Sequence, residues 1–291
     1  MQLDVESLRA FATVLDTGGI TRAAEELNLS QSAVSWKIKR LEERVGRDLL
    51  VRQGRSIRPS RDGHELLNYA RVIIDAHDEA VARLTSSELS GRVNLGATEE
   101  VSAECVSAVL GRFNRVHAGV TIEIHVDRGQ RLDEMLRAGD LDLALLQLDP
   151  EDWQDTDTHL WTDERQWISA PDWTYDTGTV PLVTFGETGF YRPLSERILR
   201  AAGIPHRVAF SGPSSASVLA AVEAGLGVAV MSGRSVVGDV IPWPRAQKLA
   251  ALPPVYQVAR VAAGAQSPVV TELLGDLEQE LGEVASSDDL A

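Results

Sequence analysis

The chain has 291 residues, 44% hydrophobic and 24% charged, which are the proportions of ordinary globular proteins and give length enough for two domains. Its single cysteine, Cys105, excludes an intrachain disulfide framework and a zinc site built from cysteines, and no apolar run approaches the roughly 18 residues of a membrane span. The net charge of −15 excludes general attraction to nucleic acid, so such binding needs a local basic surface. The N-terminus lacks the basic and then apolar layout of a signal peptide, and we expect a cytoplasmic protein without a membrane partner.

The first 45 residues predict three short helices. Residues 5–16 form the first, and the glycine pair at positions 18 and 19 ends it. The second lies before a tight turn at residues 28–30, where Ser30 suits the N-cap of the third because its hydroxyl accepts from free N–H groups. Two helices joined by a tight turn are typical of a helix-turn-helix, which places its second helix in the major groove of DNA.

The third helix has one apolar and one polar face. Apolar residues recur at spacings of four, three and four, at Val34, Ile38, Leu41 and Val45. The opposite face carries Ser32, Trp36 and Lys39, flanked by Ser35 and Arg40. This polar face is the one that we expect to meet base edges.

A basic segment follows the third helix. Residues 36–61 hold nine Lys or Arg against three acidic residues, a local charge of +6 in an acidic chain. Residues 48–52 and 56–58 predict a two-stranded wing around Gly54. A winged helix-turn-helix over residues 1–63, all-α apart from the wing, is therefore the expected N-terminal domain.

Residues 64–88 predict one long linker helix. Alternating four- and three-residue steps define a narrow apolar seam, made of Leu66, Ala70, Ile73, His77, Ala80 and Leu84. A seam this narrow needs a partner helix, and its own copy in a second subunit is the simplest one. His77 can act on this seam as a pH-sensitive element or as a polar residue that sets register.

Residues 89–291 alternate strand and helix patterns, which predicts an α/β sheet. The strands are expected at 92–97, 121–127, 141–148, 166–170, 180–185, 208–210 and 228–231, and the helices at 131–138, 193–202, 214–224 and 269–281. The chain crosses to a second subdomain near Thr162 and returns near Ala262, and residues 285–291 resemble a frayed acidic tail. Subdomain I then covers about 89–162 and 263–285, and subdomain II about 163–262. Two subdomains joined by two crossings form a hinged ligand-binding domain of the periplasmic-binding-protein kind.

The chain resembles the LysR-type transcriptional regulators over nearly its full length. The most specific part is residues 3–63, through LRAFATVLDTGGITRAAEELNLSQSAVSWKIKRLEERVGRDLLVR and PSRDG. The looser matches that follow are GRVNLGA, LRAGDLDLALL and AAVEAGLGVAVM. The resemblance implies the same architecture of winged helix-turn-helix, linker helix and two-subdomain effector-binding domain.

The resemblance also implies which residues bind DNA. Base edges are assigned to Gln31, Ser32, Ser35 and Trp36, phosphates to Lys39, Arg52, Arg55 and Ser60, and Thr21 and Arg40 complete the set. Trp36 stands where the family more often has Arg, and its single donor cannot grip guanine at two atoms. It can instead contact a thymine methyl group or a sugar, or it can pack against the wing or a neighbouring helix.

The family's effector site maps to seven residues: Thr98, Glu100, Ser102, Gly129, Gln147, Phe190 and Tyr191. Glu100 stands where members that bind carboxylates commonly have Ser or Thr, and Gln147 where they can have Arg. Two carboxylates at positions 99 and 100 disfavour an anionic ligand, so the effector is expected to be neutral or cationic. Otherwise the carboxylates point away and cap a helix, or Arg128, Arg131 or Arg192 compensates them.

The expected function is transcriptional regulation by DNA binding under control of a small-molecule effector. Partners would be double-stranded DNA, the effector, a second copy in a dimer or tetramer, and RNA polymerase. The residues offer no GxSxG, P-loop or HExxH motif and no metal-ligand spacing among the histidines, so we expect no enzyme activity, cofactor or metal. The alternatives are a cytoplasmic solute-binding protein, suggested by the C-terminal two thirds alone, and a regulator without a small-molecule effector. Cys105 fits either a small core residue or a redox-sensitive thiol.

Overall fold

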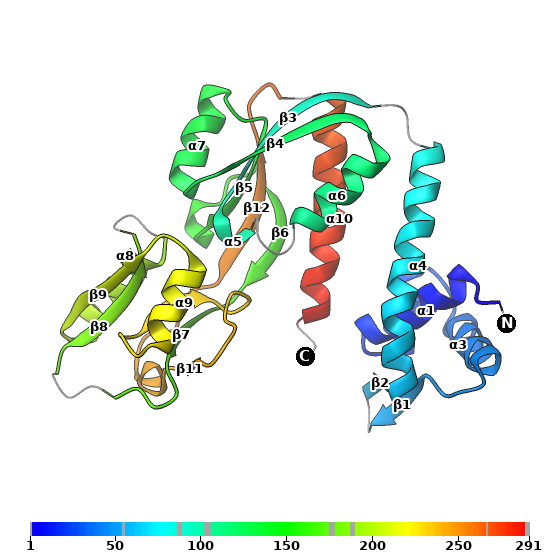
Figure 1. Ribbon diagram of the computed structural model, residues 1–291, viewed down its shortest axis with the longest axis horizontal. Coiled ribbons are helices and arrows are strands. Elements are labelled where there is room, and N and C mark those ends of the chain that lie inside the picture. Colours follow the sequence, from blue (N-terminus) through cyan, green and yellow to red (C-terminus); the bar gives the residue numbers. More distant parts are fainter. Residues whose placement is uncertain are drawn as a thin grey trace. The chain divides into compact units, whose positions relative to one another are not determined.

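The computed structural model describes residues 2–53, 56–85, 89–101, 106–174, 178–186, 190–265 and 267–288 (Figure 1). The chain divides into two compact units. The first, here the N-terminal unit, comprises residues 1–90, 111–119 and 282–291, and the second, here the regulatory unit, comprises 91–110 and 120–281.

The three N-terminal helices begin and end where the local signals place them. Helix α1 is Val5–Asp16, α2 is Ile20–Glu26 and α3 is Gln31–Val45. The hydroxyl of Ser30 accepts from the backbone N–H of Ala33 at 3.1 Å and so caps α3. Gly46 ends α3 with a left-handed φ of 75°, a conformation that glycine adopts without strain.

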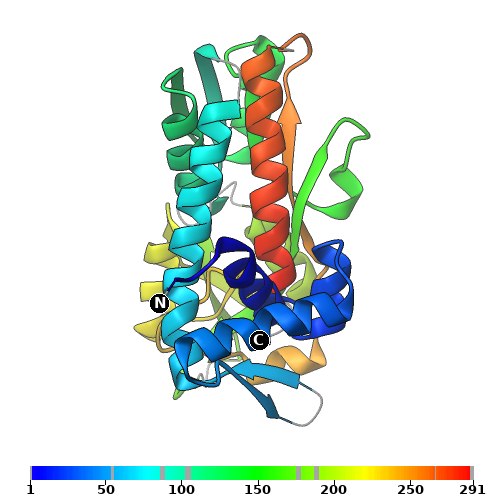
Figure 2. The same ribbon diagram turned by 90° about the vertical axis from the view of Figure 1, so that its right-hand side faces the viewer.

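The wing and linker helix complete this unit. Strands β1 (Leu50–Gln53) and β2 (Ser56–Pro59) pair antiparallel, and helix α4 is Arg61–Thr85. In Figure 2, α4 is one continuous helix with the wing and the three short helices gathered around its N-terminal half. The core of the unit is formed by the apolar faces of α1 and α3 with the N-terminal part of α4, at Leu8, Phe11, Val14, Val34, Ile38, Leu41, Leu49, Ala70 and Ile74.

The six residues that were expected to form one apolar seam on α4 do not share one environment. Ala70 is fully buried in the core of its own unit, and Leu66 packs against that core. Ile73, Ala80 and Leu84 are exposed, and Leu84 retains 88% of its accessible surface. The apolar surface of α4 is wider than one seam, so one edge contacts α1 and the other, made of Tyr69, Val72, Ile73, Ala76, Ala80 and Leu84, is uncovered in the monomer.

The regulatory unit contains a five-stranded sheet in the order β4-β3-β5-β12-β6. The strands are β3 (Ser90–Ala97), β4 (Gly119–Val126), β5 (Leu143–Leu148), β6 (Thr158–Asp163) and β12 (Val255–Val261). The helices are α5 (Glu99–Val101), α6 (Ser107–Val116), α7 (Gly129–Ala138) and α10 (Pro268–Asp288), with a 3-10 turn, η2, at Pro150–Asp152. Residues 111–116 of α6 and 282–288 of α10 fall within the N-terminal unit as defined above. Figure 1 shows α7 and α10 on opposite sides of this sheet. The sheet and these two helices form subdomain I.

Subdomain II is built on a second set of strands. Its strands are β7 (Arg165–Ser169), β8 (Val180–Phe185), β9 (His206–Gly212), β10 (Ala229–Ser232) and β11 (Ile241–Pro242). Its helices are α8 (Tyr191–Ala201) and α9 (Ser215–Glu223), with a 3-10 turn, η3, at Pro244–Lys248. The order β10-β7-β11 is antiparallel, β8 and β9 are parallel, and a bridge between Leu182 and Val228 joins the two sets.

Two expectations for this unit need correction. The return to subdomain I near Ala262 is wrong, because β12 already pairs antiparallel with β5 and β6, so the chain re-enters subdomain I before Val255. The acidic tail expected from residue 285 is wrong as far as Asp288, because α10 continues to that residue. Strand β4 lies at an edge of its sheet, where Val120 is buried and Ile124 and Val126 keep 45% and 55% of their surface exposed.

Candidate DNA-binding surface and effector site

The side of α3 that faces away from the core carries the residues expected to meet DNA. Gln31, Ser32, Ser35, Trp36, Lys39 and Arg40 are all exposed, and so is Thr21 on α2. The buried side of the same helix holds Val34, Ile38 and Leu41. One helix therefore separates its packing residues from its polar ones, as its sequence pattern predicts.

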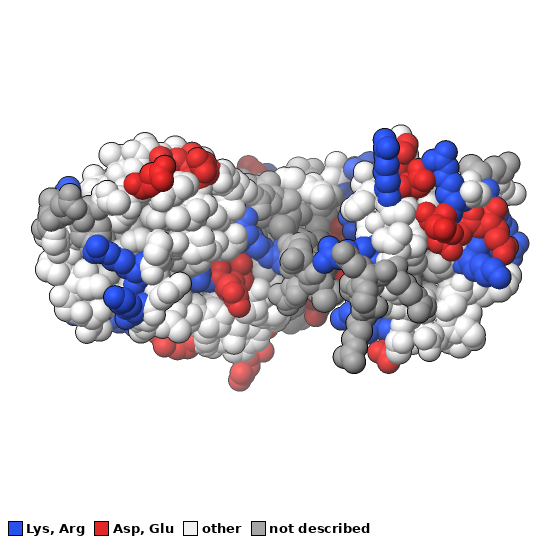
Figure 3. Space-filling model, turned by 90° about the horizontal axis from the view of Figure 1, so that it is seen from below, with Lys and Arg blue, Asp and Glu red and all other residues white. Residues whose placement is uncertain are grey.

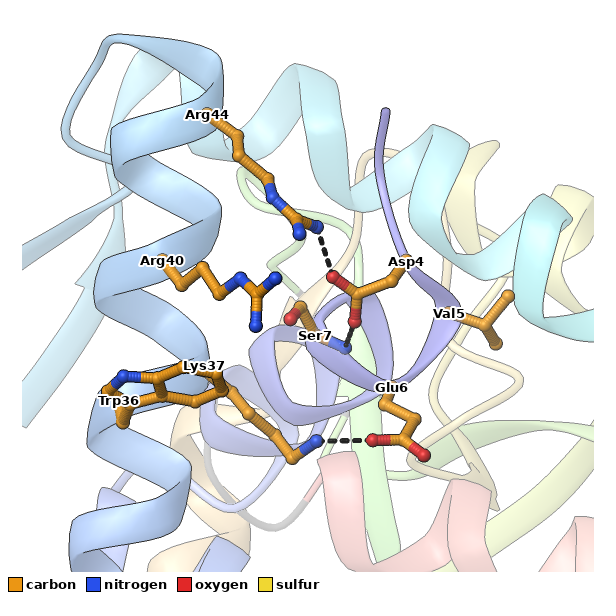
Figure 4. A pocket seen from close by; sticks show the side chains of 8 residues that line it. All are labelled: Asp4, Val5, Glu6, Ser7, Trp36, Lys37, Arg40 and Arg44. Atoms are coloured by element: carbon orange, nitrogen blue, oxygen red, sulfur yellow. Dashed lines mark hydrogen bonds and ion pairs between the residues drawn. The ribbon is translucent and has the colours of Figure 1, made fainter. Parts of the chain in front are cut away.

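Acidic residues at the start of α1 neutralise part of the basic charge of α3. Lys37 donates to Glu6 at 2.5 Å, and Arg44 pairs with Asp4 (Figure 4). Burial opposes ionisation of Asp4, but the hydrogen bonds from Ser7 and Arg44 lower the pKa of its carboxyl below the ordinary value. Lys37 and Arg44 are thus used within the unit, and Lys39 and Arg40 are left on its outer face.

Trp36 is exposed and contacts a cation. It keeps 56% of its surface, so the alternative that it packs against the wing or a neighbouring helix is wrong. The guanidinium carbon of Arg40 lies 4.9 Å from the centroid of its ring, a cation–π contact across one turn of helix. In Figure 3, the Lys and Arg side chains of the N-terminal unit, at the right of the view, stand among Asp and Glu side chains.

The wing residues give less information. Arg55 and the side chain of Arg52 lie outside the described residues. Ser60 donates its hydroxyl proton to the carbonyl oxygen of Asp48 at 2.8 Å and its backbone N–H to Leu49 at 2.8 Å. Its hydroxyl also accepts from the N–H of Gly63 at 2.9 Å, so Ser60 supports the start of α4, and both of its donors are engaged without a phosphate.

In the regulatory unit, two carboxylates after β3 join the subdomains. Gln147 of subdomain I donates to Glu100, and from subdomain II the Tyr191 hydroxyl donates to Oε2 of Glu100 at 2.8 Å. The Ser215 hydroxyl contacts Glu100 at 3.3 Å, and its backbone N–H donates to Glu99 at 3.0 Å. These five residues form what we call the carboxylate cluster. Both carboxylates accept hydrogen bonds from other elements, and Glu99 accepts from the first N–H of α9, so the interpretation that they merely cap the helix that follows them is wrong.

Burial and charge decide the protonation of this cluster. Burial raises the pKa of the Glu100 carboxyl, and the charge of Glu99 adds to this, although the hydrogen bonds from Gln147, Tyr191 and Ser215 act in the opposite direction. Burial and the charge of Glu100 raise the pKa of the Tyr191 hydroxyl well above its ordinary value, so it acts as a donor at neutral pH.

An arginine that sequence reasoning missed lies beside the cluster. The guanidinium carbon of Arg165, at the start of β7, is 4.8 Å from the ring of Phe190 and 5.9 Å from that of Tyr191. Arg165 is buried and pairs with Asp149 at 2.6 Å, but its Nε and Nη1 atoms have no hydrogen-bond partner among the described residues. The buried hydroxyl of Thr98, next to Glu99, also lacks a partner there.

Within the described residues, the structure does not bring the other expected effector residues into the carboxylate cluster. Gly129 begins α7, with open space where a side chain would stand, and Ser102 and Cys105 lie outside the described residues. Arg131 and Arg192 pair with Glu134 and Glu196 of their own helices, so neither compensates Glu100. Ser215 was missed, although the serine-rich start of α9 was a usable signal for a group of hydrogen-bond donors.

Comparison with known proteins places this architecture in a family. Residues 5–64 match the family model of the bacterial regulatory helix-turn-helix protein, lysR family, and residues 86–281 match that of the LysR substrate binding domain. The chain belongs to the LysR family. It is therefore a DNA-binding transcriptional regulator with an effector-binding domain, and the solute-binding alternative is wrong.

Curated relatives of this LysR-family chain are transcriptional regulators. PecT from Dickeya dadantii is 33% identical over 233 residues, covering 80% of this chain and 73% of PecT. DgdR from Burkholderia cepacia is 30% identical over 241 residues, covering 82% of this chain and 81% of DgdR.

Solved structures share the fold. CrgA from Neisseria meningitidis superposes with a TM-score of 0.53 at 21% identity over 97% of this chain and all of that one. DarR from Vibrio fischeri, solved in complex with DNA, gives 0.52 at 19% identity over 96% and 99% of the two chains. Within the described residues, no helix has both the length and the hydropathy of a membrane span, and no three His, Cys, Asp or Glu side chains are grouped as a metal site.

Proposed function

We propose that this LysR-family regulator reads DNA with the outer face of α3 and senses a neutral or cationic effector at the carboxylate cluster. The observation that carries the second part is the position of Glu100, whose carboxylate accepts hydrogen bonds from both subdomains. A ligand that changes these hydrogen bonds changes how firmly the two subdomains are held together. Binding and closure are then coupled in one group of residues.

The charge of the cluster supports a neutral or cationic ligand. Glu99 and Glu100 bring two carboxylates, whereas Gln147, Tyr191 and Ser215 bring only neutral donors. Each carboxylate oxygen can accept more than one hydrogen bond, so an ammonium or hydroxyl group could be added without displacing a protein donor. A carboxylate ligand would instead have to displace Glu100. The Nε and Nη1 atoms of Arg165 and the hydroxyl of Thr98, which have no hydrogen-bond partner among the described residues, are proposed to orient the uncharged part of the ligand.

On the DNA side, we assign bases to Gln31, Ser32, Ser35 and Trp36 and phosphates to Lys39 and Arg40. Their common exposure on α3 and α3's place in the helix-turn-helix support this division. Arg52 and Arg55 of the wing remain expected phosphate contacts. Ser60 is left out because its donors already serve the start of α4.

We also propose that the chain dimerises through the uncovered apolar edge of α4. Tyr69, Val72 and Leu84 are large, apolar and exposed in the monomer, and a second copy of the helix would cover them. A dimer presents two reading helices to two half-sites. A cytoplasmic location, contact with RNA polymerase, tetramer formation and the absence of enzyme activity remain expectations for a regulator of this kind.

A thermal-shift experiment tests the effector assignment. The full-length protein would be melted with single members of a panel of small amines, polyols and carboxylates, because a ligand that binds the folded state raises the melting temperature. We expect stabilisation by one or more amines or polyols, reduced in Glu100→Ala. Stabilisation of the wild type by carboxylates alone would contradict the assignment, and a panel without any effect would favour a regulator that needs no small molecule.

A further inference from the structure

Trp36 stands at the centre of the reading face of α3 and is held in place by one neighbour. It lies between Ser32 and Lys39 on the outer side of the helix, 56% exposed. The guanidinium of Arg40 covers its ring at 4.9 Å. An exposed tryptophan offers a large apolar ring and only one hydrogen-bond donor, so on this face it is suited to an apolar group of the bound DNA rather than to a phosphate.

The charged residues around Trp36 and Arg40 leave Arg40 free to hold the indole ring. Lys37 and Arg44, on either side of Arg40 along α3, are paired with Glu6 and Asp4 of α1. Arg40 itself makes no ion pair within the described part of the chain, and it contacts the ring of Trp36. Figure 4 shows these side chains around a hollow between α1 and α3, with Trp36 at its rim. The stack fixes the plane of the indole and leaves the edges of the guanidinium, with their N–H groups, available.

Base-pair chemistry narrows the partner of this indole. The major-groove edges of guanine, adenine and cytosine offer polar atoms, and covering these with an indole leaves them without hydrogen bonds. Thymine alone among the four bases adds a methyl group at C5. An apolar contact with that methyl group buries both partners without stranding a polar atom.

We propose that Trp36, held by Arg40, reads the C5 methyl group of a thymine in the major groove, while Arg40 binds the neighbouring phosphate. Trp36 is then a specificity-determining residue, and Arg40 positions it. This inference rests on the proposed placement of the outer face of α3 in the major groove. The DNA sites of this regulator should carry a thymine at one fixed position in each half-site.

The test uses the methyl group itself. Binding duplexes would be selected from a random library with the full-length protein, and each thymine of a selected site would be replaced singly by deoxyuridine, which lacks only the methyl group. Dissociation constants would be measured by fluorescence anisotropy at one salt concentration. We expect one position per half-site where the wild type loses about fourfold in affinity, the loss that corresponds to one buried methyl group.

Variants assign this loss to Trp36. In Trp36→Ala, the same deoxyuridine substitution should have no effect, and Trp36→Phe should keep part of it. Lys39→Ala is the matched control on the same face, expected to weaken both duplexes equally. Wild-type protein that is indifferent to deoxyuridine everywhere, or a preference for thymine that persists in Trp36→Ala, overturns the inference. Unchanged DNA affinity in both Lys39→Ala and Ser35→Ala would instead show that the outer face of α3 is not in the groove, a separate failure of the proposed function.

Discussion

The hydroxyl of Tyr191 donates to Oε2 of Glu100 at 2.8 Å and so joins α8 of subdomain II to the end of β3 in subdomain I. The two residues are 91 positions apart in the chain. Glu100 takes a second hydrogen bond on the same oxygen from Gln147. One carboxylate oxygen therefore links both halves of the regulatory unit through two part-buried hydrogen bonds, and hydrogen bonds to a carboxylate are stronger than those between neutral groups.

Removing the Tyr191 hydroxyl should weaken this link. Tyr191→Phe keeps the buried ring but leaves Glu100 with one donor fewer, which should lower the free energy of unfolding of the regulatory unit by about 1–3 kcal/mol. Thermal and urea unfolding measure this change. Ser211→Ala, which removes a hydroxyl from an exposed position of β9, is the control and should leave stability unchanged. Equal stability of Tyr191→Phe and wild type would show that the hydrogen bond contributes nothing net.

The protonation of Glu100 should make stability depend on pH. Its pKa is raised in the folded chain by burial, so the folded state holds the proton more tightly than the unfolded state. The contribution of Glu100 to stability should therefore be present at acidic pH and should be lost as pH rises from the ordinary carboxyl range through the raised pKa of Glu100.

Glu100→Gln isolates this contribution, because its amide does not titrate. The difference in unfolding free energy between wild type and Glu100→Gln should turn against the wild type with rising pH, and then become constant. The pKa of Asp163 is also raised by burial, but this residue is present in both proteins and its contribution cancels. A difference independent of pH would mean that the Glu100 carboxyl has the same pKa folded and unfolded.

Local sequence signals predicted the three N-terminal helices well. The cap at Ser30 and the glycines at 18 and 19 are short-range features; α3 begins at the first, and α1 ends just before the second. Strand β12 was missed because Tyr256, Gln257 and Arg260 interrupt its apolar pattern, and because its partners β5 and β6 come from far earlier in the chain. Because β12 was missed, the return of the chain to subdomain I was predicted too late in the sequence.

The carboxylate cluster also depends on contacts between residues that are far apart in the chain, which local sequence signals do not reveal. The resemblance placed Glu100, Gln147 and Tyr191 in one site, and the structure brings these three together. Ser215 and Arg165 join them only through tertiary packing, across 115 residues in the case of Ser215 and Glu100. The sequence also could not show that the donors of the site are directed at the chain's own carboxylates, which depends on how the two subdomains close.

If the uncovered apolar edge of α4 is the dimer interface, one charged substitution on it should prevent dimerisation. Ile73→Asp would bury an unpaired carboxylate in a helix–helix contact, at a cost of several kcal/mol, and should yield monomers with weaker binding to two-half-site DNA. Asn68→Asp adds the same charge to an exposed position of α4 outside this edge and should remain oligomeric. Light scattering on both variants decides the matter, and an unchanged Ile73→Asp oligomer would place the interface elsewhere.

Base and phosphate contacts on α3 should respond differently to substitution. Lys39→Ala should weaken specific and random DNA to the same extent and lower the salt dependence by about one ion, because it removes a phosphate contact. Ser35→Ala should reduce the ratio of specific to random binding, because it removes a base contact. Binding titrations over a range of salt concentrations measure both quantities. The assigned roles would be incorrect if the two variants changed this ratio equally.

Shortening Glu100 should reverse the charge preference of the effector site. In Glu100→Ser, the donors of Gln147, Tyr191 and Ser215 lose their carboxylate, and a small carboxylate such as acetate could accept from them instead. We expect acetate to raise the melting temperature of Glu100→Ser but not that of the wild type, where the donors are occupied and a third negative charge is repelled. Glu134→Ser, which removes an exposed acid from α7, controls for the change in net charge. If acetate stabilised all three proteins equally, the donors around Glu100 would not form an anion-binding group, and the repulsion of carboxylates assigned to the cluster would lose its basis.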